Sequence, residues 1–323
     1  MAFRKWLLVL GTTSLLAFGL AACGDDDNGD SDSGGGDSLS GSIAIDGSST
    51  VAPLSEPMGE LFNEENSDVQ VTVGTSGTGG GFEKFCVGET DISDASRPID
   101  EDEEVPVCEE AGIDFEEVVV ANDALTVVVN PENPVTCVTV DQVNQIYGPK
   151  STITSWGDVE GLDVDFSEEL DIFSPGADSG TFDYFTDAIN DEEGAQRSKD
   201  VNVVGEDDNA TVTGVAGSTG GIGYFGYSFF VDNQEQLKAL EIENEDGECV
   251  APSEETTQDG SYNPLGRQLF IYPSGASLEK PEVLEFVNFY LANVNDVATQ
   301  AGFIPLTDEQ LSESQTTVDS LAG

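Results

Sequence analysis

A segment rich in glycine and threonine, Gly74 to Phe82 (GTSGTGGGF), has the residue types of an anion-binding loop. It follows an alternating apolar strand pattern at Val69, Val71 and Val73, and it precedes the expected start of a helix. Glycine lets backbone N–H groups face a ligand without a side chain in the way. The first N–H groups of a helix and the positive end of its dipole also favour an anion. We therefore expect this segment to hold an oxyanion.

Two further segments place small hydroxyl residues at a strand-to-helix turn. Asp46 to Val51 (DGSSTV) follows an expected strand at Ser42 to Ile45, and Asp178 to Phe182 (DSGTF) follows one at Leu170 to Phe173. A single serine or threonine before a helix is usually only a cap. Three such turns in one chain favour a shared oxyanion site.

Arg97 is the basic residue best placed to join such a site. It lies beside Ser96 within Asp91 to Ile99 (DISDASRPI), at a turn after an expected short strand. A guanidinium group offers a planar fork of donors that matches two oxyanion oxygens. We expect Arg97 to be the one cationic ligand; an ion pair with Asp94 or Asp100 is the alternative.

Alternating strand and helix patterns indicate α/β architecture. Ala121 to Asn130 is typical of a buried strand, Gly220 to Phe230 is expected to form a strand pair, and Glu282 to Asn293 forms an amphipathic helix pattern. Arg267 precedes a short apolar strand at Leu269 to Tyr272, so a structural role is expected for it. The roughly 280 residues after the N-terminal region suffice for one large or two medium domains.

The N-terminus has the pattern of an export signal. Residues 1–22 combine the basic Arg4 and Lys5 with an apolar stretch from Leu7 to Leu20, which predicts a secretory signal peptide. The sequence LAAC, ending at Cys23, resembles the lipobox of bacterial lipoproteins, in which the cysteine receives a lipid. An ordinary signal peptide with an incidental cysteine is the alternative. Residues 23–40 then form a flexible acidic Gly/Ser tether, and the mature protein is expected outside the cytoplasm, anchored to the cell membrane by lipid.

Four cysteines remain if Cys23 carries lipid, namely Cys86, Cys108, Cys137 and Cys249. An even set in an oxidising compartment predicts disulfides, and three pairings are possible. We favour Cys86 with Cys108, which closes a short loop, and Cys137 with Cys249. A zinc site is the alternative, although the chain has no CxxC motif and no histidine.

The chain carries 10 Lys and Arg against 64 Asp and Glu, a formal net charge of −54. Nucleic acid is thereby excluded as a partner, because a polyanion needs a basic face. The acidity also opposes a small anion at long range, but salt screens this repulsion to within about 10 Å at ~0.1 M. Local N–H dipoles can still bind the anion at contact distance. The composition suggests a salt-rich habitat.

Several enzyme classes are disfavoured by the residues present. Without histidine, neither a Ser-His-Asp triad nor the usual histidine-ligated catalytic zinc can form. The glycine loop lacks the Gly-Lys-Ser/Thr ending of a nucleotide P-loop. Gly221 to Gly226 matches GxGxxG, but the context of a dinucleotide site is missing. We expect no enzyme activity, no catalytic residue, no cofactor and no metal.

The motifs DGSSTVAPL, GTSGTGGGF, DISDASRPI, SPGADSGTFDYF and GGIGYFGY occur in this order. The combination resembles the PstS family, the phosphate-binding proteins of bacterial ABC phosphate importers, over essentially the whole mature chain. The resemblance implies the α/β fold of type II periplasmic binding proteins, with two lobes joined by two hinge crossings. Lobe I would comprise residues 41–124 plus 264–323, and lobe II residues 125–263.

The resemblance also implies which residues contact phosphate. They would come from the first turn, the glycine loop, the Ser-Arg pair and the turn of the other lobe: Ser49, Thr50, Val51, Thr78, Gly79, Ser96, Arg97, Ser179, Gly180 and Thr181. Two positions depart from the best-known branch of the family. Pro175 stands where that branch has an arginine, and Ser96 stands where it has an aspartate that accepts the proton of phosphate.

The missing aspartate bears on specificity, because a buried carboxylate would reject sulfate, which has no proton to donate at neutral pH. Asp46, Asp94, Asp178 or Asp208 could take this role. We expect a monomeric binding protein that captures inorganic phosphate and delivers it to the membrane permease subunits of an ABC importer. The alternatives are a carrier of sulfate or molybdate, a secreted phosphatase-like enzyme, and a phosphate sensor without a transport role.

Overall fold

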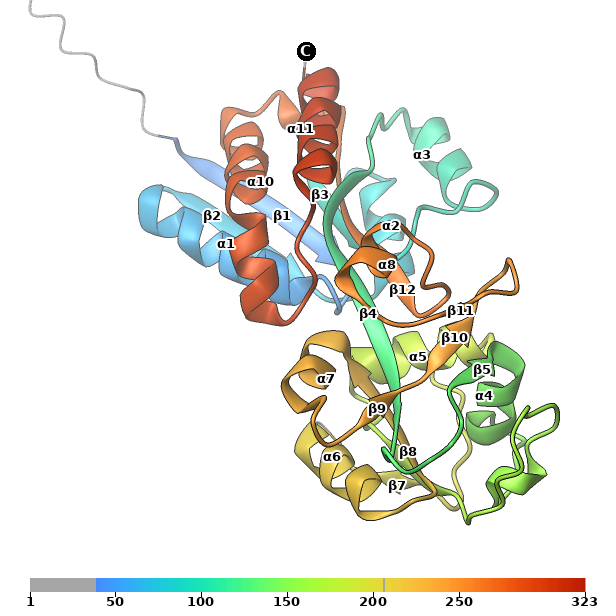
Figure 1. Cartoon of the computed structure of the whole chain (residues 1–323). Helices are drawn as coiled ribbons and strands as arrows, with labels where there is room; N and C mark the ends of the chain where they lie inside the picture. Colours follow the sequence, from blue (N-terminus) through green and yellow to red (C-terminus); the bar gives the residue numbers. More distant parts are fainter. Residues whose placement is uncertain (1–38, 206, 323) are drawn as a thin grey trace, which may run out of the picture. The chain divides into compact units, whose positions relative to one another are not determined.

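The computed structural model describes residues 39–205 and 207–322, which belong to one compact unit, Ser38–Gly323. The predicted signal peptide, Cys23 and most of the predicted tether lie outside the described residues. The described part of the chain contains two large hydrophobic cores, and we call the structure around the first core lobe I and that around the second core lobe II (Figure 1).

Lobe I contains most of the N-terminal half of the described chain and its C-terminal helices. Its elements are β1 (Gly41–Gly47), α1 (Ala52–Glu65), β2 (Val69–Gly74), α2 (Thr78–Phe85), β3 (Ile92–Ala95), α3 (Val105–Ala111), α9 (Gly275–Leu278), α10 (Pro281–Ala301) and α11 (Asp308–Ala322).

Lobe II is built from the middle of the chain. Its elements are β5 (Cys137–Thr139), α4 (Val140–Tyr147), the 3-10 helix η1 (Trp156–Asp158), β6 (Asp171–Ser174), α5 (Gly180–Asn190), β7 (Asn202–Val203), α6 (Asp208–Gly217), β8 (Gly221–Gly226), α7 (Tyr227–Asn233), β9 (Lys238–Ala239), β10 (Glu241–Glu243), β11 (Cys249–Val250) and α8 (Glu254–Gln258).

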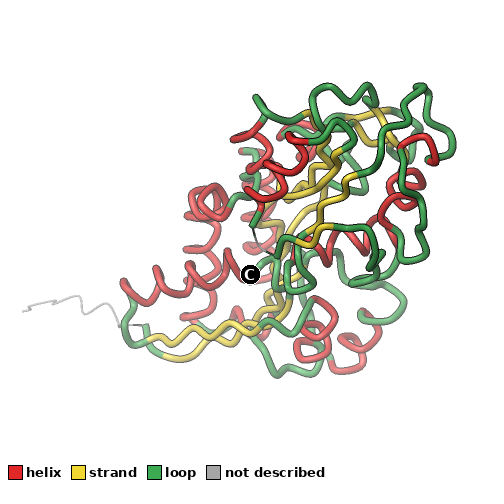
Figure 2. The backbone as a smooth tube through the Cα atoms, turned by 90° about the horizontal axis from the view of Figure 1, so that it is seen from below, coloured by secondary structure: helices red, strands yellow, loops and turns green. Residues whose placement is uncertain are grey.

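Two antiparallel strands, β4 (Val118–Val129) and β12 (Gly266–Pro273), connect the lobes. They lie in the middle of a sheet with the order β2-β1-β3-β12-β4-β8-β6-β7, in which β9 also pairs with β4. β5, β10 and β11 form a separate small sheet. Figure 2 shows the strands running between the helices of the two lobes.

Strand β4 contributes to both cores, which explains its long apolar run. Val120 and Ala121 pack in the first core, whereas Ala124 and the residues that follow pack in the second. Within lobe II, Val127 and Val129 face the second core and Val128 faces a smaller cluster on the other side of the sheet, as the alternation of strand side chains requires. The chain therefore crosses between lobes near residues 122 and 123, which are polar and buried.

Two sequence predictions differ from the structure. The segment 220–230, expected to be a strand pair, forms one strand and then the helix α7. The glycines of its GxGxxG pattern lie within β8 rather than in a turn before a helix. The amphipathic helix expected from Glu282 to Asn293 is longer, because α10 starts at Pro281 and ends at Ala301 before Gly302, whose φ of 83° stops the helix.

Both favoured disulfide pairings are confirmed. Cys86 is bonded to Cys108, and Cys137 is bonded to Cys249. Cys86 follows the last turn of α2 and Cys108 lies in α3, and both are fully buried in the small cluster that contains Phe82 and Phe85. The first bond thus attaches α3 to the helix that begins at the glycine loop.

We predict that replacing Cys86 and Cys108 together with alanine lowers the free energy of unfolding by about 3 kcal/mol, because the bond closes a loop of 22 residues. Urea unfolding of the variant and of the parent chain measures this difference. Reducing agent added to the parent chain breaks the Cys137–Cys249 bond as well, so this curve gives the upper limit of the loss. A loss below about 1 kcal/mol would contradict the prediction.

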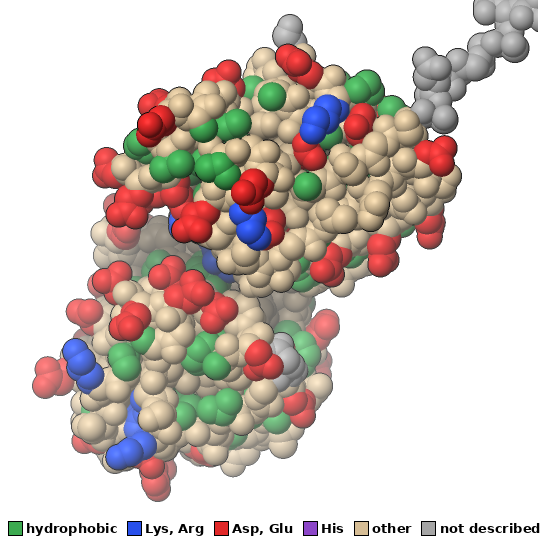
Figure 3. Space-filling view, turned by 180° about the vertical axis from the view of Figure 1, so that it is seen from behind, with side chains coloured by type: hydrophobic (Ala, Val, Ile, Leu, Met, Phe, Trp, Pro, Cys, Tyr) green, Lys and Arg blue, Asp and Glu red, His purple; other side chains and the backbone are tan. Residues whose placement is uncertain are grey.

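Acidic side chains are spread over the face in Figure 3, and basic ones are few. Within residues 39–205 and 207–322, no helix is long and apolar enough to span a membrane.

Candidate functional site

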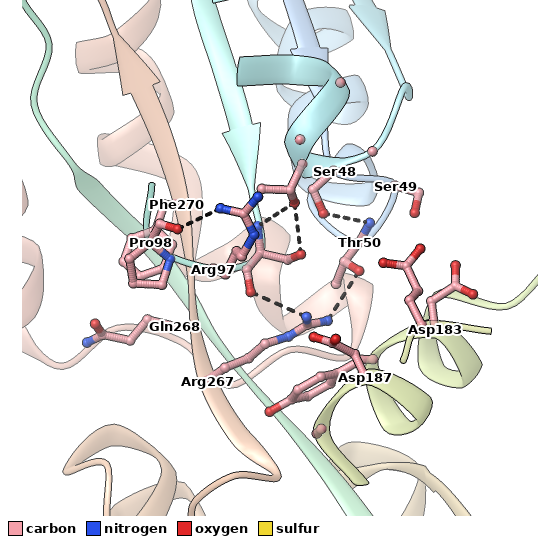
Figure 4. A pocket seen from close by; sticks show the side chains of 18 of the residues that line it. Ser48, Ser49, Thr50, Arg97, Pro98, Asp183, Asp187, Arg267, Gln268 and Phe270 are labelled. Carbon is pink, nitrogen blue, oxygen red and sulfur yellow. Dashed lines mark hydrogen bonds between the residues drawn. The ribbon is translucent and has the colours of Figure 1, made fainter. Parts of the chain in front are cut away.

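A cavity of about 780 Å³ lies where three loops of lobe I face helix α5 of lobe II and strand β12. The loops follow β1, β2 and β3 and supply Ser48, Ser49, Thr50, Ser76, Thr78, Gly79, Ser96 and Arg97. Figure 4 shows this arrangement, with the serine and threonine side chains near two arginines. Parallel strands β2, β1 and β3 end at the same sheet edge, which is why segments separated in sequence meet there.

The helices that begin at this cavity have no side-chain caps. Neither α1, after Val51, nor α2, after Gly77, has a side-chain hydrogen bond at its N-cap. In contrast, side chains of Thr139, Asp207 and Ser253 cap α4, α6 and α8. At α1, however, the N–H groups of Ala52 and Leu54 already donate to the carbonyls of Ser48 and Val51, and Pro53 has no N–H. Of these two helices, α2 is therefore the one whose first N–H groups can receive an anion.

The glycines of the loop have different roles. Gly77 turns the chain before α2 with a φ of 83°. Gly79 lines the cavity, and a Cβ atom there would have only Arg97 Nη2 and Glu104 Oε1 within 4 Å, at 3.8 and 3.9 Å. Gly81 is different, because a Cβ atom would lie 2.5 Å from Gly47 Cα. One glycine thus leaves the ligand space open, and another lets α2 pack closely on β1.

Ser96 and Thr78 hold two of the loops together. The Thr78 and Ser96 hydroxyls are 3.1 Å apart, and the Ser96 N–H donates to Thr78 Oγ1 at 3.2 Å. Arg97 lines the cavity and forms a bidentate ion pair with Glu104, with both N–O distances 2.8 Å. The hydrogen bonds with Glu104 raise the pKa of Arg97, so it stays charged. Neither alternative partner, Asp94 nor Asp100, forms this ion pair.

Arg267 is a cavity residue that the sequence prediction assigned a structural role. Its Nη2 donates to Thr50 Oγ1 and its Nη1 to the carbonyl of Ser96, both at 3.3 Å (Figure 4). It also forms an ion pair with Asp123 at 3.3 Å. The cavity therefore has two guanidinium groups, Arg97 and Arg267, and the prediction of one cationic ligand is incomplete.

The predicted turn of lobe II lies close to the loops but does not line the cavity. α5 begins at Gly180, and its N-cap Ser179 makes no side-chain cap. A Cβ atom on Gly180 would be 3.4 Å from Thr50 Oγ1. Thr181 belongs to the same first turn. Val51, from the first turn of lobe I, is also absent from the cavity wall, and its N–H donates to the carbonyl of Ser48.

Three carboxylates face the cavity from lobe II, and none was singled out in the sequence. They are Asp183 and Asp187 of α5, and Glu193 in the following loop. Burial raises the pKa of Asp183, and burial together with the charges of Asp183 and Asp187 raises that of Glu193. Asp183 and Asp187 are spaced i and i+4, which predicts that they lie on one face of the helix. The abundance of acidic residues in the sequence made this pair hard to recognise.

The four aspartates proposed as proton acceptors do not line the cavity. Asp46 forms an ion pair with Lys84 and accepts hydrogen bonds from Ser76; these lower its pKa despite the opposing effect of burial. Asp178 is exposed in the turn before α5, and Asp208 begins α6. Asp94 is fully buried beneath the first loop.

The residues described by the structure include one compact group of potential metal ligands, Cys137, Glu241 and Cys249. Its two sulfur atoms are already joined in a disulfide, so this group does not fit a metal ion. The donors around the cavity are hydroxyls, N–H groups and guanidinium groups, which fit an anion instead.

Comparison with known proteins agrees with this anion-binding geometry. Residues 32–294 match the PBP superfamily domain. Protein SphX of Synechococcus elongatus is 45% identical over 266 residues, covering 82% of this chain and 77% of that protein. The phosphate-binding protein PstS of Staphylococcus saprophyticus is 38% identical over 323 residues, covering 99% of this chain and 96% of that protein.

A solved structure extends the similarity to the fold. The crystal structure of a possible phosphate binding protein from Planctomyces limnophilus has a TM-score of 0.82 and 40% sequence identity, and the match covers 88% of this chain and all of that chain. These relatives confirm the α/β fold of periplasmic binding proteins and a family of binding proteins rather than enzymes. The chain belongs to the PBP superfamily and, within it, to the PstS family of phosphate-binding proteins.

Proposed function

We propose that this protein captures inorganic phosphate in the cavity between its lobes and delivers it to the membrane permease of an ABC importer. The observation that carries the proposal is the N-terminus of α2 without a side-chain cap, together with two arginines at the same cavity. The N-terminus of α5, also without a side-chain cap, lies beside Thr50. Serine and threonine hydroxyls and N–H groups would replace the water around the ion. The two guanidinium groups, which are paired with Glu104 and Asp123, would donate further hydrogen bonds to its oxygens.

Ligands would come from both lobes. On lobe I, we propose contacts from Ser49, Thr50, Thr78, Gly79, Ser96 and Arg97, to which we add Arg267. The N–H of Val51 donates to the carbonyl of Ser48, so it would have to exchange this bond for one to the ion. On lobe II, Ser179, Gly180 and Thr181 would reach the ion when the lobes close. The cavity is much larger than one tetrahedral ion, so closure by hinge bending is required for contacts from both sides. The division of the chain at 124/125 and 263/264 is part of this proposal.

The carboxylates of lobe II favour phosphate over sulfate. Asp183, Asp187 and Glu193 face the same space as the arginines. Hydrogen phosphate has a proton to donate to a carboxylate, whereas sulfate at neutral pH would meet it charge to charge. This observation disfavours the rival function of a sulfate or molybdate carrier.

Calorimetric titration with phosphate, at low and high salt and with or without excess sulfate, tests the proposal. The mature chain is used with Cys23 replaced by serine, which prevents lipidation. We expect phosphate binding at both salt concentrations and no displacement by sulfate. Absence of binding heat, or displacement by sulfate, would refute a phosphate-specific function.

Location and assembly are also proposals. We propose an extracytoplasmic monomer that Cys23 anchors to the cell membrane through lipid, supported by the signal-like residues 1–22 and by the family of binding proteins. Fractionation of cells tests the anchor, because the Cys23→Ser variant should leave the membrane fraction while the parent chain stays in it. Light scattering of the released protein gives its molar mass and so tests whether it is a monomer.

A further inference from the structure

Arg267 lies at the crossing between the lobes and faces a buried carboxylate. In the antiparallel pair of β4 and β12, Arg267 is the direct cross-strand partner of Asp123. Both Nε and Nη2 of Arg267 donate to Asp123 Oδ2 at 3.3 Å. Asp123 is only 8% exposed. An ion pair thus lies in the strand pair that must bend when the lobes move.

The same guanidinium group touches both lobes. Toward lobe I it donates to Thr50 and to the carbonyl of Ser96, in two of the three loops that line the cavity. Toward lobe II it stacks on the ring of Tyr184, with 3.4 Å between Cζ and the ring centroid. Tyr184 is a buried residue of α5, and its hydroxyl donates to the carbonyl of Pro264 next to β12. Arg267 is therefore in contact with the hinge, with the loops after β1 and β3, and with α5.

The hydrogen bonds of Arg267 are long. All four are 3.3 Å, beyond the usual range of about 2.7–3.2 Å for N–H donors. Arg97 differs, because its two bonds to Glu104 are 2.8 Å. Long hydrogen bonds are weaker, so Arg267 gives up less hydrogen-bond energy when an oxyanion beside Thr50 and Ser96 replaces one of its partners.

We propose that Arg267 is a positioning residue that couples anion binding to lobe closure, with Asp123 as the internal competitor for its guanidinium group. An oxyanion beside Thr50 attracts Arg267 and weakens its bonds to Asp123. The stacked ring of Tyr184 moves with the guanidinium group, so α5 and its N-terminus approach the anion. This inference rests on the proposed binding of an oxyanion in the cavity.

Four variants separate this coupling from a structural role. Arg267→Lys keeps the charge but loses the fork and the flat face, so phosphate affinity should fall by about 30-fold. Asp123→Asn removes the competitor, so affinity should rise by about 3- to 10-fold. Tyr184→Leu removes the stacked ring, whereas the matched control Tyr184→Phe keeps it. The combined variant Asp123→Asn with Arg267→Gln leaves no unpaired charge in the hinge, so it guards against misfolding.

Two measurements are made with inorganic phosphate on each variant. Calorimetry gives the affinity, and small-angle X-ray scattering gives the change in radius of gyration when phosphate is added. We expect compaction in the parent chain and in Tyr184→Phe, and loss of most of it in Arg267→Lys, Tyr184→Leu and the combined variant. A structural role alone would lower the melting temperature without separating Tyr184→Leu from Tyr184→Phe in compaction.

The outcomes distinguish this inference from the proposed function. If the parent chain binds phosphate and compacts, but Arg267→Lys and the combined variant do the same with parent affinity, the role of Arg267 is refuted and the proposed function stands. Unchanged or lower affinity in Asp123→Asn would refute the competition. A parent chain that binds no phosphate would refute the proposed function and this inference together.

Discussion

Replacing Gly81 with alanine is expected to lower the free energy of unfolding by about 3 to 5 kcal/mol, because α2 could no longer pack against β1. The added Cβ atom would lie 2.5 Å from Gly47 Cα, 2.8 Å from Ser93 Oγ and 2.9 Å from the carbonyl oxygen of Asp46. Two of these three atoms belong to the backbone, so a change of rotamer cannot relieve the overlap. Urea unfolding measures the loss.

Gly79→Ala is the matched control, since it adds the same methyl group two residues earlier in the same helix. Its Cβ atom would make only ordinary contacts, at 3.8 Å or more, and alanine in a helix gains up to about 1 kcal/mol over glycine. We expect parent-like or higher stability in this variant, with weaker phosphate binding because the methyl group enters the cavity. Equal stability of the two alanine variants would show that the close approach at Gly81 does not limit the fold.

Replacing Asp94 with asparagine is expected to stabilise the protein increasingly as the pH rises. Asp94 is fully buried, its Oδ1 accepts a hydrogen bond from Ser55 at 3.0 Å, and its Oδ2 has no partner within the described residues. Burial, with a smaller contribution from the charge of Asp46, raises its pKa to about 8. Asparagine has nearly the same shape and cannot ionise.

The sign of the effect follows from proton linkage. As the pH rises above 3.8, the pKa of this group in the unfolded chain, the unfolded chain releases the proton that the folded chain keeps. The free energy of unfolding of the parent therefore falls by about 1.4 kcal/mol per pH unit until the pH reaches the folded pKa of about 8. The stability of Asp94→Asn relative to the parent should therefore increase by up to about 6 kcal/mol across this window. Denaturant titrations at several pH values measure the difference.

Asp100→Asn is the control for this experiment, because Asp100 is exposed and backbone N–H groups of Glu103 and Asp102 lower its pKa. The contribution of the Asp100 carboxylate to stability is present above its unfolded pKa and is lost only in acid. The difference in unfolding free energy between Asp100→Asn and the parent should therefore stay constant from about pH 5 to about pH 9. A flat difference for Asp94→Asn as well would mean that Asp94 is ionised in the folded protein.

The sequence alone predicted those features whose signal is local. The turns at Ser49 and Thr50, at Thr78 and at Ser179 each lie at a strand-to-helix junction, and the structure has helices beginning at or beside all three. The period-2 pattern of β2 and the 3.6-residue pattern of α10 reflect which face each element buries. The cysteine pairing was also accessible, because few combinations exist for four residues.

Local patterns failed where neighbouring elements decide the outcome. Aromatic residues with high strand propensity follow β8, yet Tyr227 to Asn233 form a helix, with Phe229 packing on Phe225 of the strand. Tertiary contacts overrode propensity there. Gly81 was interpreted as part of an anion-binding loop. Glycine is required there because β1, more than 30 residues earlier in the chain, leaves no space for a Cβ atom.

The site itself depends most on tertiary structure. Arg267 reaches the loops of lobe I only because β12 pairs with β4 in a register that places it opposite Asp123 and beneath Thr50. Asp183 and Asp187 line the same cavity as the arginines because the side of α5 packs toward it, and Glu193 follows in the next loop. The sequence by itself determined the helix N-termini that can hold an anion, since these are set by residues within one turn. Which charged groups surround that anion was decided by strand register and lobe packing, which bring together residues more than 80 positions apart.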